Sequence, residues 1–134
     1  MQTNPRTPFV TTILILAVGA TVGAAARYYG SLWAVQQFGP SFPYGTLLIN
    51  VIGSFVLGCF LTLAAARPAI GPEARLLVAT GFCGSFTTFS TFSVEAYTLL
   101  LGGRYLSGAL YLFGSMALGL LAVVLGVALA RALV

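Results

Sequence analysis

The sequence predicts an all-α integral membrane protein with four membrane-spanning helices, and composition and charge spacing carry this prediction. Of its 134 residues, 59% are hydrophobic and 6% are charged, whereas about a quarter of the residues in an ordinary soluble domain are charged. With a mean hydropathy of +1.02, the chain has more apolar surface than a water-soluble fold of this length buries. The charges leave four long uncharged stretches, namely 7–26, 28–66, 76–94 and 105–130.

Turn-forming residues divide these stretches into helices, because a spanning helix needs about 20 mostly apolar residues. The 28–66 stretch is too long for one pass, and it contains the helix-breaking sequence GPSFP at 39–43. RP at 67–68 and GP at 71–72 predict the second connection, and GG at 102–103 predicts the third. The predicted helices of this single membrane domain, 1–134, are 9–31, 44–66, 73–99 and 104–131, preceded by a flexible N-terminus, 1–8.

The charged residues exclude two classes of function. All six basic residues are arginine, histidine and lysine are absent, and the only acids are Glu73 and Glu95. The commonest general base, the Schiff-base amine and the commonest metal ligand are therefore missing, so we expect that the protein is not an enzyme. The net charge of +4 is dispersed rather than clustered, which excludes a nucleic-acid-binding patch.

The arginines also bear on how the chain is oriented in the membrane. Four passes place four arginines on the side of the termini and two on the other side. They are Arg6, Arg67, Arg75 and Arg131 against Arg27 and Arg104. Because the positive-inside rule needs a clear excess to orient a chain, this near-balance permits insertion in both directions.

Two predicted helices carry polar or small residues at every fourth position, which places them along one helix face. Such residues allow close helix packing, as does the Gly19-x-x-x-Gly23 pair of the first helix. An amide in lipid is costly without partners, so Asn50 is expected to meet polar groups or water. Tyr111 fits either an interfacial aromatic or a pore-facing residue. The two series are Thr46, Asn50, Ser54, Gly58 and Thr62, and Ser107, Tyr111, Ser115 and Gly119.

Two charges are hard to assign to loops. Arg27 lies near the end of the first predicted helix, where its long side chain either reaches the membrane surface or faces an aqueous vestibule and attracts anions. Glu95 either reaches the surface in the same way or caps a polar stack formed by Thr88 and Thr91.

The most unusual stretch is GFCGSFTTFSTFS at 81–93, in the third predicted helix. Gly81 and Gly84 weaken a helix, which predicts a break near its middle. In lipid the freed backbone groups must find partners inside the protein. The carbonyls that end the first half suit a hard cation, and the amides and hydroxyls that begin the second half suit an anion.

Hydroxyls and phenyl rings follow the predicted break. The hydroxyls of residues 87–93 are dense enough to reach every face of a helix, so at least one face presents a series of O–H donors. Phe89 and Phe92 are three residues apart and are predicted to stack on one side. The edge of a phenyl ring is positive, so it faces an anion without adding a fixed charge that would trap it.

This stretch closely resembles the signature of the Fluc/CrcB fluoride channels, a family of small bacterial membrane proteins. The match extends to residues 19–27, to GTLLIN at 45–50, and to Tyr111 and Ser115, so it covers all four predicted helices. One departure is Ser85, where members of the family often carry a second glycine.

The resemblance implies an antiparallel, dual-topology homodimer in the bacterial inner membrane that exports fluoride passively through two pores. It also implies a structural sodium ion at the centre of the dimer, held by the backbone carbonyls of Gly84 and Thr87. By the same resemblance Arg27 faces a vestibule, whereas the role of Glu95 stays open. The implied pore residues are Asn50, Phe89, Phe92, Thr46, Ser90, Thr91, Ser93, Tyr111 and Ser115.

A small dual-topology, proton-coupled multidrug exporter is the alternative. Such proteins also have four helices, and they need an acid at membrane depth to exchange protons for cationic compounds. Glu95 is the only candidate acid, and the first two predicted helices carry none. A membrane scaffold without transport activity would not require the series of hydroxyls.

Overall fold

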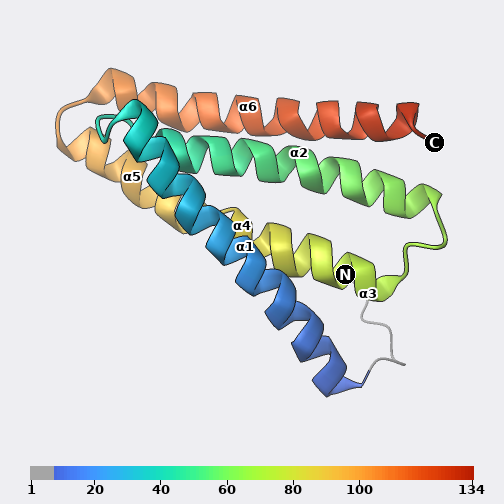
Figure 1. Ribbon diagram of the computed structural model, residues 1–134. Helices are drawn as coiled ribbons and strands as arrows, with labels where there is room; N and C mark the ends of the chain where they lie inside the picture. Colours follow the sequence, from blue (N-terminus) through green and yellow to red (C-terminus); the bar gives the residue numbers. More distant parts are fainter. Residues whose placement is uncertain (1–7) are drawn as a thin grey trace.

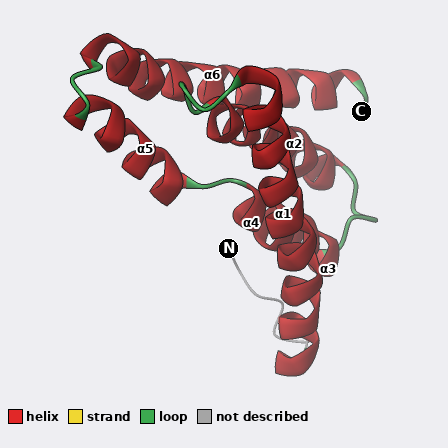
Figure 2. Ribbon diagram, turned by 60° about the vertical axis from the view of Figure 1, so that its left-hand side comes forward, coloured by secondary structure: helices red, strands yellow, loops and turns green. Residues whose placement is uncertain are grey.

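Four helical spans make up the part of the chain that the computed structural model describes, residues 8–134 (Figure 1). Each span is long and apolar enough to cross a membrane, which confirms the predicted all-α membrane fold. Every regular element in the described range is a helix, as Figure 2 shows. Of the predicted flexible N-terminus, residues 1–7 lie outside the described part, and Pro8 directly precedes the first helix.

Three spans are single helices, and the third span consists of several segments. The single helices are α1 (Phe9–Phe38), α2 (Tyr44–Ala66) and α6 (Tyr105–Ala132). The third span comprises α3 (Pro72–Arg75), the π-helical segment η1 (Leu76–Cys83), α4 (Gly84–Phe86) and α5 (Phe89–Leu101).

The first helix is longer than predicted, because it continues to Phe38 instead of ending near residue 31. Residues 32–38 contain no glycine or proline that would end the helix earlier. Gly39 ends it with a φ of 78°, in the left-handed region that favours glycine, and its amide donates to the Val35 carbonyl. The connection between α1 and α2 is therefore short.

The spans alternate in direction, so the connections gather at the two ends of the bundle. In Figure 1 the α2–α3 connection and the C-terminus lie toward one end, and the α1–α2 and α5–α6 connections lie at the other. Arg67, Arg75 and Arg131 therefore lie toward the first end, and Arg104 lies at the second. Arg6 lies outside the described residues.

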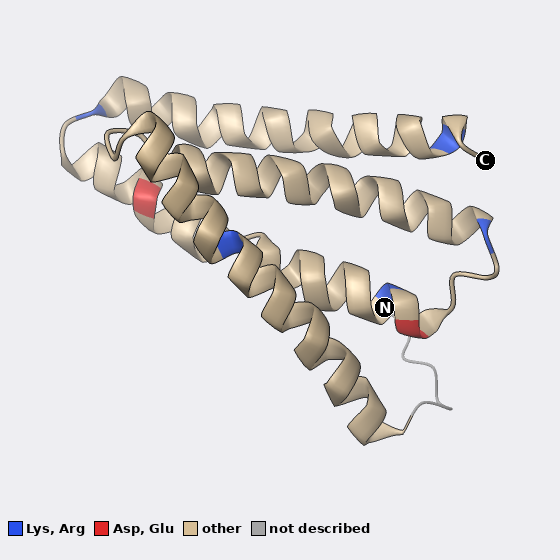
Figure 3. Ribbon diagram, viewed as in Figure 1, with Lys and Arg blue, Asp and Glu red and all other residues tan. Residues whose placement is uncertain are grey.

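Most charged residues lie near helix ends, where arginines bind backbone carbonyls. Arg67 donates to the Leu133 carbonyl at 3.1 Å, so it holds the end of α6. Figure 3 shows two charges within helices instead, a basic one along α1 and an acidic one along α5. The sequence identifies them as Arg27 and Glu95.

Close contacts between helices depend on glycines at positions where a side chain would not fit. A Cβ atom on Gly126 of α6 would overlap the backbone of α2. A Cβ atom on Gly19 or Gly23 of α1 would overlap carbonyl oxygens of η1, and on Gly19 it would also lie 3.0 Å from the Cα of Gly81. The glycine pair of the first helix therefore has the packing role that its spacing predicts.

The third span breaks as predicted, but at Thr87–Thr88 instead of at Gly81 and Gly84. Gly84 keeps helical dihedral angles, with a φ of −63° and a ψ of −29°. Thr87 and Thr88 are extended, with ψ values of 159° and 116°. Figure 2 shows these residues as a loop between α4 and α5. Gly81 has a different role, because it is buried against Gly19.

Candidate functional site at the helix break

Asn50 of α2 supplies the partners that the broken helix lacks. Its Nδ2 donates to the Thr88 carbonyl at 3.1 Å, and the Thr88 amide donates to its Oδ1 at 2.8 Å. One side-chain amide therefore satisfies both backbone groups of the extended residue. This agrees with the expectation that Asn50 meets polar groups, because unpaired backbone groups in the membrane cost several kcal/mol.

Thr88 also begins the second half of the span as the N-cap of α5. Its Oγ1 accepts a hydrogen bond from the Thr91 amide at 3.2 Å and donates to Thr91 Oγ1 at 3.0 Å. Threonine is a favoured N-cap residue because its oxygen satisfies an amide that has no helical partner. The first turn of α5 is therefore held by the residue that Asn50 holds.

These bonds release two carbonyls from the helical pattern. In an uninterrupted helix the amide of Thr88 would donate to the Gly84 carbonyl, and the amide of Thr91 would donate to the Thr87 carbonyl. Both amides bind elsewhere, as described above. Backbone carbonyls are ligands that hard cations accept. Within residues 8–134 no three acidic, cysteine or histidine side chains come together as an alternative cation site.

A second polar group lies among α2, α5 and α6. Thr46 Oγ1 donates to Glu95 Oε1 at 2.9 Å, and the Tyr111 hydroxyl donates to Glu95 Oε2 at 2.6 Å. Only 5% of Thr46 and 1% of Tyr111 are exposed. The hydrogen-bond partners of Glu95 are thus Thr46 and Tyr111 rather than Thr88 and Thr91, which bind each other. Of the two roles left open for Glu95, a cap on Thr88 and Thr91 does not agree with these bonds.

The two phenylalanines that follow the break have different surroundings. Phe92 is 8% exposed and packs in a buried cluster with Ala96, Leu99 and Tyr111. Phe89 is 79% exposed. Their rings are tilted by 45° with centroids 5.9 Å apart, so they are not stacked as predicted. Phe92 instead approaches Tyr111, with ring centroids 5.1 Å apart.

The other predicted site residues lie around these groups. Ser90, Thr91 and Ser93 are exposed on the first turns of α5. The hydroxyl of Ser115, one turn beyond Tyr111 on α6, is buried and has no hydrogen-bond partner in the described structure. Arg27 is half-buried on α1.

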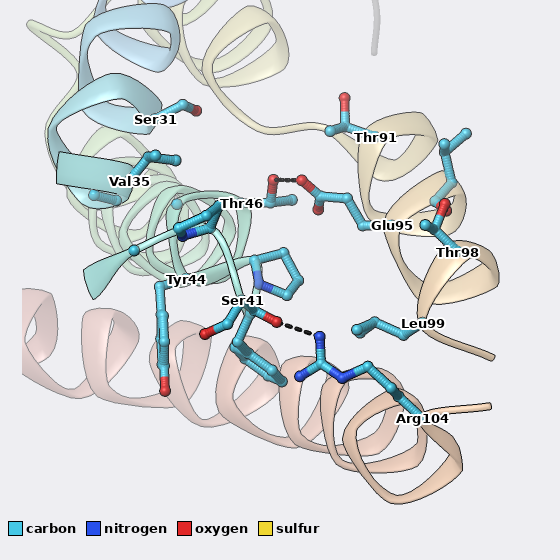
Figure 4. A pocket seen from close by; sticks show the side chains of 17 residues that line it. Ser31, Val35, Ser41, Tyr44, Thr46, Thr91, Glu95, Thr98, Leu99 and Arg104 are labelled. Carbon is cyan, nitrogen blue, oxygen red and sulfur yellow. Dashed lines mark hydrogen bonds between the residues drawn. The ribbon is translucent and has the colours of Figure 1, made fainter. Parts of the chain in front are cut away.

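A cavity of about 470 Å³ lies beside Glu95, between the α1–α2 connection and α5 (Figure 4). Thr46, Thr91 and Arg104 contribute polar side chains to its wall. In Figure 4 the Glu95 carboxylate points to Thr46, and the Arg104 guanidinium points to Ser41.

Sequence reasoning missed the partners of Glu95, although one signal was present. Tyr111 and Thr46 carry hydroxyl protons at membrane depth, and such protons need an acceptor. Glu95 is the only acid of the second half of the third span and of the fourth, so it is the strongest available acceptor. No comparable pattern in the sequence indicates that Arg104 lines the cavity, because its partner there is a backbone carbonyl.

The fold and the site define a helical membrane protein that passes the bilayer four times and gathers hydroxyl, amide and aromatic groups around a broken helix. The chain belongs to the CrcB family: the family described as “CrcB-like protein, Camphor Resistance (CrcB)” matches residues 14–127. This confirms the resemblance inferred from residues 81–93.

Individual relatives match nearly the whole chain. The fluoride-specific ion channel FluC of Roseiflexus sp. (strain RS-1) is 50% identical over 121 residues, which cover 90% of this chain and 98% of the relative. Its namesake from Synechococcus sp. (strain JA-2-3B'a(2-13)) is 49% identical, with 94% and 93% covered. That of Chloroflexus aurantiacus (strain ATCC 29366 / DSM 635 / J-10-fl) is 46% identical, with 89% and 94% covered. These relatives are named as ion channels rather than enzymes, in agreement with the expectation that this chain is not an enzyme.

The hydrogen bonds of Asn50 lead to a stability prediction. We expect Asn50→Ala to lower the free energy of unfolding by about 2 kcal/mol, because it leaves the N–H and C=O groups of Thr88 without partners. Asn50→Asp keeps the acceptor for the Thr88 amide but turns a carboxylate oxygen toward the Thr88 carbonyl, so it should also lower the free energy of unfolding. The measurement is unfolding by SDS titration in detergent micelles.

The matched control is Ser54→Ala, which removes a polar group one turn further along α2. It should unfold like the wild type. If Asn50→Ala and Ser54→Ala unfold at the same SDS fraction, the break does not depend on Asn50.

Proposed function

We propose that this protein is a fluoride-selective ion channel that carries fluoride passively out of the bacterial cell across its inner membrane. The observation that carries the proposal is the match, along about nine-tenths of this chain, to relatives named as fluoride-specific ion channels. The break and its donors lie within the matched residues 14–127.

The chemistry around the break agrees with this proposal. Fluoride is a small, strongly hydrated anion, so a pore must replace its water with hydrogen-bond donors. The first turn of α5 offers backbone amides at the positive end of a helix of 13 residues, together with the hydroxyls of Ser90 and Thr91. The Ser93 hydroxyl lies one turn further on and donates to the Phe89 carbonyl at 2.9 Å. The ring edge of Phe92 adds positive potential without a full charge. Neutral donors bind the ion without trapping it.

Beyond Phe92, the proposed path has further hydroxyl groups on α6 and α2. Ser115 keeps an unused donor in a buried position, and Tyr111 contacts the Phe92 ring. In the proposed path Arg27 attracts anions toward a vestibule. The residues that we propose to line the path are Asn50, Phe89, Phe92, Thr46, Ser90, Thr91, Ser93, Tyr111 and Ser115.

We further propose an antiparallel homodimer with two pores. Phe89 follows the break directly and is 79% exposed in the single chain, so a second copy would cover it and complete the surroundings of the path. The sequence count of four arginines against two supports insertion in both directions, with Arg27 lying within α1 rather than at its end.

Dual insertion is tested by labelling from each side of the membrane. A cysteine added after Val134 should react with a membrane-impermeant thiol reagent from both sides of a cell membrane, because both orientations occur. Cys59 and Cys83 lie within spans, so a chain without the added cysteine is the control. Labelling from one side only would exclude the antiparallel dimer.

A structural sodium ion is the proposed cofactor, and the released carbonyls of Gly84 and Thr87 support it. Two antiparallel copies would bring four such oxygens to the dimer axis, where a hard cation of small charge fits an all-carbonyl set. The ion would hold the two breaks together, and these backbone groups would be satisfied as the membrane requires.

The sodium site is tested with a side-chain variant that keeps the carbonyl ligand and by exchanging the cation. Thr87→Ser should keep the ion, because the ligand is a carbonyl oxygen, and the dimer should dissociate more readily in potassium or lithium than in sodium. The measurements are dimer stability in each salt and a high-resolution density map in sodium buffer. A map without density at the dimer axis would contradict the site.

Fluoride selectivity is tested with liposomes loaded separately with fluoride and chloride. Wild-type protein should release fluoride rapidly and chloride negligibly. Phe92→Leu should lower fluoride efflux about tenfold, because leucine lacks the positive ring edge, while stability falls by less than about 1.5 kcal/mol because apolar volume is kept. Asn50→Asp should also suppress efflux, since it places negative charge beside the path.

The control is Leu120→Ile, a change at a side chain that is 69% exposed on α6. Equal release of both anions by the wild type would contradict selectivity. Proton-coupled uptake of a cationic compound without fluoride flux would support the multidrug exporter instead.

A further inference from the structure

We propose that Arg104 is a positioning residue that latches the α1–α2 connection over one mouth of the path and thereby holds Phe42 against Tyr111. This inference rests on the proposed fluoride channel. It assigns a role to residues 39–43 and to Arg104, which the pore described above does not include.

The first observation is a hydrogen bond that joins two connections. The Arg104 guanidinium donates to the carbonyl of Ser41, a residue 63 positions earlier in the chain, and its Nη2 lies 3.5 Å from Ser107 Oγ. The Arg104 amide donates to the Leu99 carbonyl at 3.0 Å, so the residue is itself fixed at the end of α5. Figure 4 shows the side chain reaching from the start of α6 to the α1–α2 connection.

The second observation is that the α1–α2 connection has few internal bonds. Pro40 and Pro43 have no N–H group to donate, and the cavity of about 470 Å³ lies against residues 39–43 in place of a packed core. Within the connection the amide of Tyr44 donates to the Phe42 carbonyl at 2.8 Å. A hydrogen bond from a charged donor is among the stronger ones in proteins, and the bond from Arg104 ties this segment to the start of α6.

The third observation is what the connection carries. Phe42 meets Tyr111 edge to face, with ring centroids 5.5 Å apart and an interplanar angle of 82°. It packs against the buried cluster that includes Phe92 and Tyr111. The Tyr111 hydroxyl is the donor to Glu95. Arg104 thus holds Ser41, and the next residue along the chain, Phe42, contacts Tyr111.

The latch follows from these contacts. If the bond to Ser41 is lost, the connection is free to lift away and Phe42 leaves the face of Tyr111. Water then reaches a ring that is 1% exposed in the structure, and the Tyr111 ring loses one of the two aromatic contacts that fix its direction. The donors of the path are then displaced, although the helices stay in place.

Efflux measurements on a double-mutant cycle test the latch. In fluoride-loaded liposomes Arg104→Gln and Phe42→Leu should each lower the efflux rate about tenfold, the size of one lost charge-assisted bond or aromatic contact. Because both changes break one line of contacts, the double variant should be no slower than the slower single variant. Effects that multiply to about a hundredfold would overturn the latch.

The matched control is Arg131→Gln, which removes an arginine from the other end of α6. It should transport fluoride like the wild type. Equal efflux in Arg104→Gln and Arg131→Gln, with active wild type, would overturn the latch alone. Absence of fluoride efflux in the wild type would overturn the proposed function instead.

Efflux in high salt and a conservative variant distinguish an electrostatic role of Arg104 from a positioning role. If Arg104 acted only by attracting anions, the efflux deficit of Arg104→Gln would disappear in about 1 M of an impermeant salt, where the Debye length is about 3 Å. Arg104→Lys would then have the efflux of the wild type. If Arg104 acts as a latch, the efflux deficit of Arg104→Gln persists in salt. Arg104→Lys then restores efflux only in part, because lysine keeps a charged donor group but lacks the planar fork of arginine. Should Arg104→Gln not fold, Arg104→Lys with Phe42→Leu completes the same cycle, and full independence there would overturn the proposal.

Discussion

A break in a membrane helix requires protein partners for each backbone group that it frees, and the rest of this site depends on how Asn50 meets that requirement. By binding both the amide and the carbonyl of Thr88, Asn50 fixes an extended residue that then caps α5. The direction of α5 places Phe92 and Glu95 against α6, and the donors diverted from helical bonds leave the Gly84 and Thr87 carbonyls available. One side chain on α2 thus sets the positions of the donors on α5 and of the two released carbonyls.

The carboxylate of Glu95 adds a second constraint, because it already holds the hydroxyl protons of Thr46 and Tyr111. These bonds tie α2, α5 and α6 together at a point that is nearly closed to solvent. In the proposed channel, an anion beside Tyr111 would compete for these protons with a carboxylate that is fixed in place. Ser115, whose hydroxyl is buried and unpaired, is the donor nearby on α6 that requires no such exchange.

The number of spans, the fold class and the existence of a break were predictable, because they follow from hydropathy, turn residues and the polar stretch 81–93. The position of the break was not, since it depends on a hydrogen bond between residues that lie 38 positions apart. Glycine propensity pointed to Gly81, yet that glycine serves a close approach to α1. The predicted end of α1 near residue 31 was too early, because the helix continues until Gly39 ends it.

Packing explains why a break at this position is tolerated without loss of the fold. The part of the third span before the break, η1 and α4, packs on α1, where Gly19, Gly23 and Gly81 allow backbone contact. The part after it, α5, packs on α6 instead. The two halves therefore belong to different helix pairs, and an uninterrupted helix would be unable to follow both partners. The helix α2 packs against both halves, and the residue that stabilises the break lies on α2.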